Sequence, residues 1–311
     1  MIADFYHEPV MVKEVIESLL VSKTGIYVDC TVGGAGHSYA ILKETDAFLV
    51  GIDCDDQALQ YAEKRLAEFG SRKVLIRANF ADLGKILKDL NIEKVDGVLL
   101  DLGVSSHQLD TEQRGFSFNQ QALLDMRMDR SLKISAYDIV NSFAQDELEK
   151  IIRFYGEEKM AARIARAISK KRQQSPIETT TELAAIIASC MPAKLKWQKI
   201  HPATRTFHAI RIAVNNELDN IRPAIDAAAE ALKPGGRLCV ISFHSLEDRI
   251  VKNEIRFLGG VCICPKDIPF CVCQKEAKLK NLTPKVIVPS AEEIEANPRA
   301  RSSKLRVAGR I

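Results

Sequence analysis

The chain has 311 residues, 46% of them hydrophobic and 27% charged, and its formal net charge is +3. These fractions are those of an ordinary globular protein and argue against disorder, and no apolar run approaches the roughly 18 residues needed to cross a bilayer. The first residues lack a basic segment followed by an apolar core, so we expect no secretory signal, no membrane partner, a cytoplasmic location and mostly reduced cysteines.

Short apolar runs alternate with amphipathic stretches in the first half of the chain, which is the pattern of βαβ units in a parallel sheet. We expect a helix from 57 to 69 and four strands, over residues 26–30, 48–52, 74–76 and 95–100. Later in the chain we predict a fifth strand and a closing antiparallel pair, over residues 237–242, 283–288 and 304–308.

The middle of the chain has a different pattern, with helices and no strands. Residues 114–118 are expected to form a loop with two exposed aromatic side chains, and helices are predicted over 147–153 and 159–172. A capping box, Thr179–Glu182, opens a further helix through Ile187. We therefore predict an α/β fold in which a Rossmann-like core with a seven-stranded, mostly parallel sheet (1–110 and 202–311) is interrupted by an inserted α-helical domain (111–201).

A glycine-rich turn, Gly33–Gly36, directly follows the first strand and opens a helix. Backbone N–H groups of such a turn can face a ligand at close range. Asp53 ends the second strand, where a carboxylate can accept hydrogen bonds from both hydroxyl groups of a ribose. Capping of the following helix is the alternative role for Asp53. The two features together predict a nucleotide site.

Two aromatic positions bear on the choice of cofactor. A dinucleotide fingerprint that begins at Gly34 needs glycine at position 39, where this chain has Tyr39. The missing glycine hinders a pyrophosphate but not a single nucleoside that carries methionine. The sequence therefore favours an S-adenosylmethionine-dependent methyltransferase over a nicotinamide-dependent dehydrogenase. Phe80, after the third strand, is placed to pack against an adenine ring and is equally suited to the core.

Asp101 follows the fourth strand, at the edge where doubly wound sheets bind ligands. To methylate an exocyclic amine, an enzyme must orient it and accept its hydrogen bonds, because its lone pair is delocalised into the ring. Asp101, Ser105 and Ser106 are suitable acceptors. Helix capping is the alternative role for the two serines.

Seven separated motifs then occur in order over nearly the whole chain: His7–Val10, Tyr27–His37, Asp101–Asp110, Gly115–Phe118, Pro202–Asn215, Ser242–Arg249 and Asn297–Arg306. Together they closely resemble the bacterial small-subunit ribosomal RNA methyltransferase H family, also called MraW. The resemblance implies N4-methylation of one cytidine in the decoding centre of 16S rRNA, within the assembled small ribosomal subunit, with S-adenosylmethionine as cofactor.

The resemblance also implies a set of cofactor contacts, carried over by position: Ala35, Gly36, His37, Asp53, Phe80, Asp101 and Gln108. Family members usually have proline where this chain has His107, for which we expect a small effect on loop rigidity and no change of chemistry. A homodimer is a further expectation. The alternative function is that of a non-catalytic RNA-binding or ribosome-assembly factor that has kept the fold.

A helix predicted from Thr204 has an apolar face (Phe207, Ile210, Val214, Leu218, Ile221) and a polar stripe (Thr204, His208, Arg211, Asn215). With Arg205, the stripe suits a surface that contacts RNA, and it equally suits residues that satisfy the buried ends of neighbouring loops. His244, after the fifth strand, is either a residue of the RNA-binding loop or a locally bonded structural histidine.

Basic residues are concentrated in one segment, because residues 159–205 hold ten of the 44 Lys and Arg residues and only two of the 41 acids. On the helix from Lys159, one face is apolar and another carries Arg163, Arg166 and Lys170, which we call the basic stripe. We predict that this stripe docks RNA, together with Lys194, Lys196 and Lys199 around Trp197. Solvated helix faces and a buried Trp197 are the alternatives.

Four cysteines near the end of the chain, Cys262, Cys264, Cys271 and Cys273, are close enough in sequence to bind zinc tetrahedrally. Their Cys-x-Cys spacing is tighter than that of the usual zinc knuckle. We therefore expect reduced cysteines in a surface loop and no metal.

Overall fold

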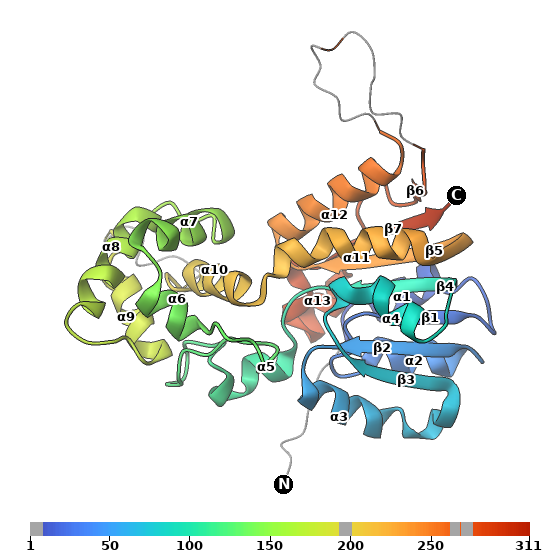
Figure 1. Ribbon diagram of the computed structural model, residues 1–311, viewed down its shortest axis with the longest axis horizontal. Helices are drawn as coiled ribbons and strands as arrows, with labels where there is room; N and C mark the ends of the chain where they lie inside the picture. Colours follow the sequence, from blue (N-terminus) through green and yellow to red (C-terminus); the bar gives the residue numbers. More distant parts are fainter. Residues whose placement is uncertain (1–8, 193–200, 262–267, 269–275) are drawn as a thin grey trace. The chain divides into compact units, whose positions relative to one another are not determined.

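The computed structural model describes residues 9–192, 201–261, 268 and 276–311. The chain divides into two compact units (Figure 1): unit 1 comprises Met1–Gly103 and Leu218–Ile311, and unit 2 comprises Val104–Glu217. In the described ranges no helix is both long and apolar enough to span a membrane.

Unit 1 is built on a seven-stranded sheet in the order β3-β2-β1-β4-β5-β7-β6 (Figure 1). The strands are β1 (Ile26–Asp29), β2 (Phe48–Asp53), β3 (Lys73–Arg77), β4 (Val95–Asp101), β5 (Leu232–Ser242), β6 (Leu279–Asn281) and β7 (Lys304–Arg310). The first five strands in this order are parallel, and β7 runs antiparallel to both β5 and β6. The predicted α/β fold with a mostly parallel, seven-stranded sheet is confirmed.

Helices cover both faces of this sheet. They are α1 (Val12–Leu19), α2 (Gly36–Glu44), α3 (Asp56–Arg65), α4 (Leu83–Asp89), α11 (Glu217–Ala231), α12 (Ser245–Leu258) and α13 (Ala291–Ala296), with the 3₁₀ helices η1 (Ala67–Arg72), η2 (Phe80–Asp82) and η5 (Pro298–Ser302). Neighbouring residues of a strand point to opposite faces, so Val28 packs with α4, α11 and α12, whereas Tyr27 packs with α1, α2 and α3. Each face of the sheet therefore packs against its own apolar core, and the two cores together fix the positions of the strands.

Unit 2 is helical and has its own apolar core. Its elements are α5 (Ser106–Asp110), η3 (Glu112–Arg114), α6 (Ala136–Ser142), α7 (Gln145–Tyr155), α8 (Ala161–Arg172), α9 (Thr180–Ser189) and α10 (Thr204–Asn215). The capping box at Thr179 is present, since the Thr179 side chain accepts from the Glu182 N–H. The unit is wider than the insertion predicted at 111–201, because α10 packs against α6 and α7.

Three local expectations were wrong. On its outer side β7 pairs with β6 (Leu279–Asn281) rather than with 283–288, of which only Ile287 forms an isolated bridge. The Thr283 hydroxyl accepts from the Val307 N–H at 2.9 Å, so the ladder stops there. The apolar face predicted through Ile221 is broken, because Asn216 is left-handed (φ 50°) and ends α10. In the loop 114–118, Phe116 is buried in the core of unit 2.

Candidate active site

Three carboxylates end three neighbouring strands of the parallel sheet: Asp29 on β1, Asp53 on β2 and Asp101 on β4. The carboxyl ends of parallel strands meet at one edge, so the three side chains share that edge. Burial is the main cause that raises the pKa of Asp29 and of Asp53 to about 6, and it raises the pKa of Asp101 well above its usual value. An edge with three buried acids favours a cationic ligand over an anionic pyrophosphate.

The predicted glycine turn joins β1 to α2 in a conformation that needs its small residues. Gly33 (φ 48°) and Ala35 (φ 55°) both have positive φ, and Ala35 is the N-cap of α2. The Gly34 carbonyl accepts from Arg65 Nη1 of α3 at 2.6 Å. Because α3 fixes this carbonyl, the turn keeps one orientation of its peptide groups.

Asp53 holds the turn to the end of β2. Its Oδ2 accepts from the Gly33 N–H at 2.8 Å and its Oδ1 from the Asp55 N–H at 2.9 Å. Capping of α3 belongs to Asp55 instead, whose side chain accepts from the Gln57 N–H. A carboxylate has about four lone-pair sites, so two remain for ribose hydroxyl groups.

Asp29 is a residue of this site that we did not single out from the sequence. It is 1% exposed, and its carboxylate accepts from the Ser38 hydroxyl at 2.6 Å and from the Thr31 N–H at 3.2 Å. The Thr31 hydroxyl in turn accepts from the Asp101 N–H at 2.7 Å. Asp29 is therefore connected to the end of β4 through Thr31. The rule that selected Asp53 and Asp101, a carboxylate at a strand end, also applies to Asp29.

Asp101 and His37 form a second buried polar pair at this edge, with side chains 12% and 5% exposed. Asp101 Oδ2 lies 3.7 Å from His37 Nδ1. Asp101 Oδ1 has no hydrogen-bond partner among the residues that the structure describes. A buried acceptor that is left open in this way fits a ligand that brings its own donor, such as an amine.

Pro9 and Val10, at the end of the first sequence motif, contact the end of the glycine turn. The two motifs therefore form one local structure. A Cβ on Gly36 would lie 2.4 Å from Pro9, so only glycine fits there. The Val10 carbonyl accepts from His37 Nε2 at 2.9 Å. Burial of the imidazole lowers the pKa of His37 to about 4, so this ring is neutral at physiological pH.

Phe80 begins η2 after β3 and is half-buried against the core that contains α4 and α11. This position agrees with both roles considered for it, an adenine contact and a core residue.

The turn between β5 and α12 is closed by its own side chains. Glu247, 1% exposed, accepts from the N–H groups of Phe243 and His244, and its carboxylate lies 3.1 Å from His244 Nε2. His244 is also the N-cap of α12. These contacts are those of a locally bonded structural histidine, the alternative to an RNA contact.

The carboxylate of Asp248 accepts from Nε of Arg306 on β7 at 2.7 Å. This ion pair links the motifs Ser242–Arg249 and Asn297–Arg306.

Two further site candidates belong to unit 2, where they cap a helix. Ser105 is the N-cap of α5, and its hydroxyl accepts from the Gln108 N–H at 3.2 Å while Gln108 Oε1 accepts from the Ser105 N–H at 3.0 Å. This capping box is the structural role considered for Ser105.

The polar stripe on α10 is divided between buried and exposed residues. Arg211 forms two hydrogen bonds to the carboxylate of Glu217, at 2.9 and 2.8 Å, and both side chains are buried. Asn215 binds the backbone of Met126 and Met128. Arg211 and Asn215 are thus engaged within unit 2, as the structural alternative requires. Thr204 and Arg205 are exposed, and His208 is half-buried.

The basic stripe lies on α8, whose apolar residues Ile164 and Ile168 are buried in the core of unit 2. Arg163, Arg166 and Lys170 are exposed, as their spacing predicts. Arg172, by contrast, binds the carbonyls of Val140 and Phe143 and supports α6. The other predicted docking residues and the candidate zinc ligands lie outside the described residues: Lys194, Lys196, Trp197, Lys199, Cys262, Cys264, Cys271 and Cys273.

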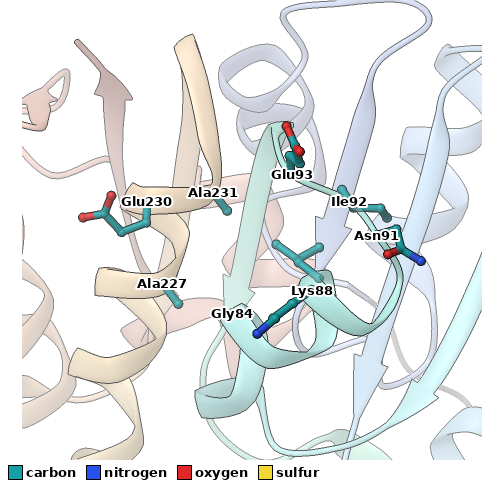
Figure 2. A pocket seen from close by; sticks show the side chains of 9 residues that line it. Gly84, Lys88, Asn91, Ile92, Glu93, Ala227, Glu230 and Ala231 are labelled. Atoms are coloured by element: carbon teal, nitrogen blue, oxygen red, sulfur yellow. The ribbon is translucent and has the colours of Figure 1, made fainter.

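A groove of about 630 Å³ lies elsewhere on unit 1, between α4 and α11 (Figure 2). Its lining includes the apolar residues Leu87, Ile92 and Ala231 and the charged residues Lys88, Glu93 and Glu230. Ile92 lies three residues before β4, and Ala231 directly precedes β5. The groove therefore lies where these strands begin, whereas the carboxylates lie where strands end.

Comparison with known proteins identifies relatives over the full length of the chain. The sequence model of the MraW methylase family matches residues 4–311. The ribosomal RNA small subunit methyltransferase H of Syntrophus aciditrophicus is 57% identical over 308 residues, which are 98% of each chain. The protein of the same description from Clostridioides difficile is 51% identical over 310 residues, 99% of this chain and all of that one. A solved rRNA methylase from Streptococcus thermophilus is 11% identical, with a TM-score of 0.43 over 96% of this chain and 93% of that one.

Proposed function

The chain belongs to the MraW methylase family, and from this membership we infer that it is an S-adenosylmethionine-dependent methyltransferase of ribosomal RNA. We further propose that it methylates the exocyclic N4 amine of a single cytidine in the decoding centre of 16S rRNA, within the assembled small subunit. Family membership also argues against the dehydrogenase alternative. The homodimer, the cytoplasmic location and the absence of metal stay predictions.

The carboxylate edge of unit 1 supports the cofactor assignment. When bound, S-adenosylmethionine supplies an electrophilic methyl group on a positively charged sulfur. The turn from Gly33 to His37 brings backbone close to such a ligand, and Asp53 keeps lone pairs for its ribose. Asp29 and Asp53, whose pKa values are about 6, are largely ionised above that pH and suit the positive charge. Phe80 is proposed as the adenine contact.

The single observation that carries the proposed chemistry is the buried acceptor Oδ1 of Asp101, which has no hydrogen-bond partner among the described residues. An exocyclic amine is a weak nucleophile because its lone pair is delocalised into the ring. An acceptor that binds one N–H turns the lone pair toward the methyl group and stabilises the positive charge that develops on the nitrogen. Asp101 is fixed for this role by β4 and by the hydrogen bond from its backbone N–H to Thr31.

For the RNA, we propose that the exposed basic stripe of α8 contacts phosphates. Arg205, exposed in the first turn of α10, is proposed to contribute to the same function. The internal contacts of Arg211, Asn215 and His244 favour a structural role for these three residues.

The proposal is tested by transfer of labelled methyl groups from S-adenosylmethionine to small subunits that lack their own modification, followed by mapping of the labelled nucleotide. We expect one labelled cytidine, with the label on N4. Asp101→Asn should reduce turnover at saturating cofactor, whereas Asp46→Asn, an exposed carboxylate before β2, should not. Label on another atom would overturn the N4 assignment. Cofactor binding without any transfer would favour the non-catalytic assembly factor.

A further inference from the structure

His37 has two ring nitrogens with different surroundings. Nε2 lies 2.9 Å from the Val10 carbonyl oxygen, which can only accept a hydrogen bond. Nε2 must therefore carry the ring proton. In the neutral ring the other nitrogen, Nδ1, is then an unprotonated acceptor, and it faces Oδ2 of Asp101.

The charged groups around Asp101 favour its protonated form. Asp29 from β1 and Glu247 from α12 both raise its pKa, in addition to burial, and the neutral His37 from α2 contributes no positive charge. A protonated carboxyl group can donate its proton to Nδ1, whereas an ionised carboxylate facing the bare Nδ1 lone pair would be repelled. The 3.7 Å between Oδ2 and Nδ1 exceeds a hydrogen bond by about 0.5–1 Å, and such distances often shorten when a substrate fills the site.

We propose that His37 acts through Asp101 as a positioning residue: its bare Nδ1 holds the proton of the Asp101 carboxyl group on Oδ2 and keeps Oδ1 free for the substrate amine. This inference rests on the proposed N4 methylation. It assigns the side chain of His37 a part in proton transfer, in addition to the cofactor contact expected for this position.

The protons balance as follows when the methyl group has been transferred. The amine nitrogen has gained a methyl group and a positive charge, and it must lose one N–H proton. The N–H bond breaks and an O–H bond forms on Oδ1, while the O–H bond on Oδ2 breaks and an N–H bond forms on His37 Nδ1. Asp101 stays neutral, and the positive charge moves from the substrate to the imidazole. His37, whose pKa is about 4, then releases this proton readily to water.

Two variants separate this role from a structural one. The amide nitrogen of glutamine reaches approximately the position of histidine Nε2, so His37→Gln keeps a donor for the Val10 carbonyl but has no base for Asp101. In His37→Asn the side chain offers an acceptor near the position of Nδ1 but cannot take up a proton. Because the cofactor contact of this turn is proposed for its backbone, we expect both variants to bind the cofactor with a Kd close to that of the wild type. His37→Gln should also keep its Tm. In both, kcat at pH 7 should fall about 100-fold, the lower end of what general acid–base groups contribute.

The pH profile is the more specific measurement. With His37 present, kcat should change little with pH around neutrality, because the neutral pair accepts the proton. In His37→Gln only ionised Asp101 can accept it, and because burial raises the pKa of Asp101, kcat should increase with pH. A flat profile with kcat within about twofold of the wild type would overturn the inference.

A second readout does not depend on activity or on the fold of a variant. Nitrogen-15 NMR of the wild-type protein at pH 7 should show His37 with a protonated Nε2 and a bare Nδ1. The opposite tautomer would overturn the inference even if His37→Gln failed to fold. If the wild type transfers no methyl group to a cytidine amine, the proposed function fails; if it does and His37→Gln behaves like the wild type, only the role of His37 fails.

Discussion

Asp53→Asn tests the cofactor site through a difference that depends on pH. The wild-type carboxylate ionises with a pKa of about 6, and ribose hydroxyl groups donate hydrogen bonds to the ionised form. Hydrogen bonds to a charged group contribute about 1.5–3 kcal/mol and those between neutral groups about 0.5–1.5 kcal/mol. Two such bonds, at Oδ1 and Oδ2, weaken in the variant by about 2–3 kcal/mol together, so above pH 6 its Kd should be about 30–150-fold higher.

Below a pH of about 6 the wild-type side chain becomes protonated and loses the same advantage. The affinity of the wild type for the cofactor should therefore fall as the pH falls through 6. Position 53 cannot titrate in Asp53→Asn, so it gives the affinity of the variant no pH dependence. The difference in Kd between the two proteins should therefore disappear at low pH. Calorimetry at a series of pH values measures both curves, and their difference removes the cofactor's own titrations. Asp56→Asn, an exposed neighbour paired with Arg77, is the control and should follow the wild type. Equal affinities of wild type and Asp53→Asn at pH 8 would refute a ribose contact by Asp53.

Three further changes test the other parts of the molecule. Replacing the basic stripe by serine should raise the KM for small subunits and flatten its salt dependence without changing the Kd of the cofactor. The control replaces the exposed Lys64, Lys85 and Lys88 by serine. An unchanged salt slope, or an equal effect in the control, would contradict RNA docking at the basic stripe. Arg114→Met should lower the free energy of unfolding by about 2–4 kcal/mol, because this 1% exposed side chain donates to the carbonyls of Arg127 and Met128. Arg163→Met, at an exposed site, is the control. Equal Tm values of the two variants would contradict a stabilising role of Arg114. Gly36→Ala should destabilise by about 1–3 kcal/mol through the clash with Pro9, whereas Gly84→Ala, whose Cβ would meet Ala227 at 3.7 Å, should not; thermal unfolding of both proteins decides this.

The parts of the fold that follow from local periodicity could be predicted from the sequence. All five parallel strands lie within a few residues of their expected positions, because each is a short apolar run bounded by turns. The capping box at Thr179 and the exposed stripe on α8 depend only on neighbours three or four residues away, and both are present.

What could not be predicted depends on partners distant in the sequence. Whether Arg211 faces RNA or a carboxylate is decided by Glu217 and by the turn at Asn216, which a helical pattern does not reveal. The role of Val10 as acceptor for His37 depends on a contact between residues 27 positions apart. The short strand β6 carries too few residues for a recognisable alternation, and the Thr283 side chain that ends its ladder looks like any strand residue.

The central position of β4 and β5 in the sheet has a consequence for folding. β4 ends at Asp101, but its partner β5 begins only at Leu232, after the whole of unit 2 has been synthesised. During translation, β4 therefore leaves the ribosome with one of its edges unpaired, whereas unit 2 contains all the contacts of its own core and can form first. A unit that folds early shortens the effective loop between the two strands and reduces the entropy cost of closing it. Mutations in the core of unit 2 should for this reason slow the assembly of the sheet, although they lie in a different unit.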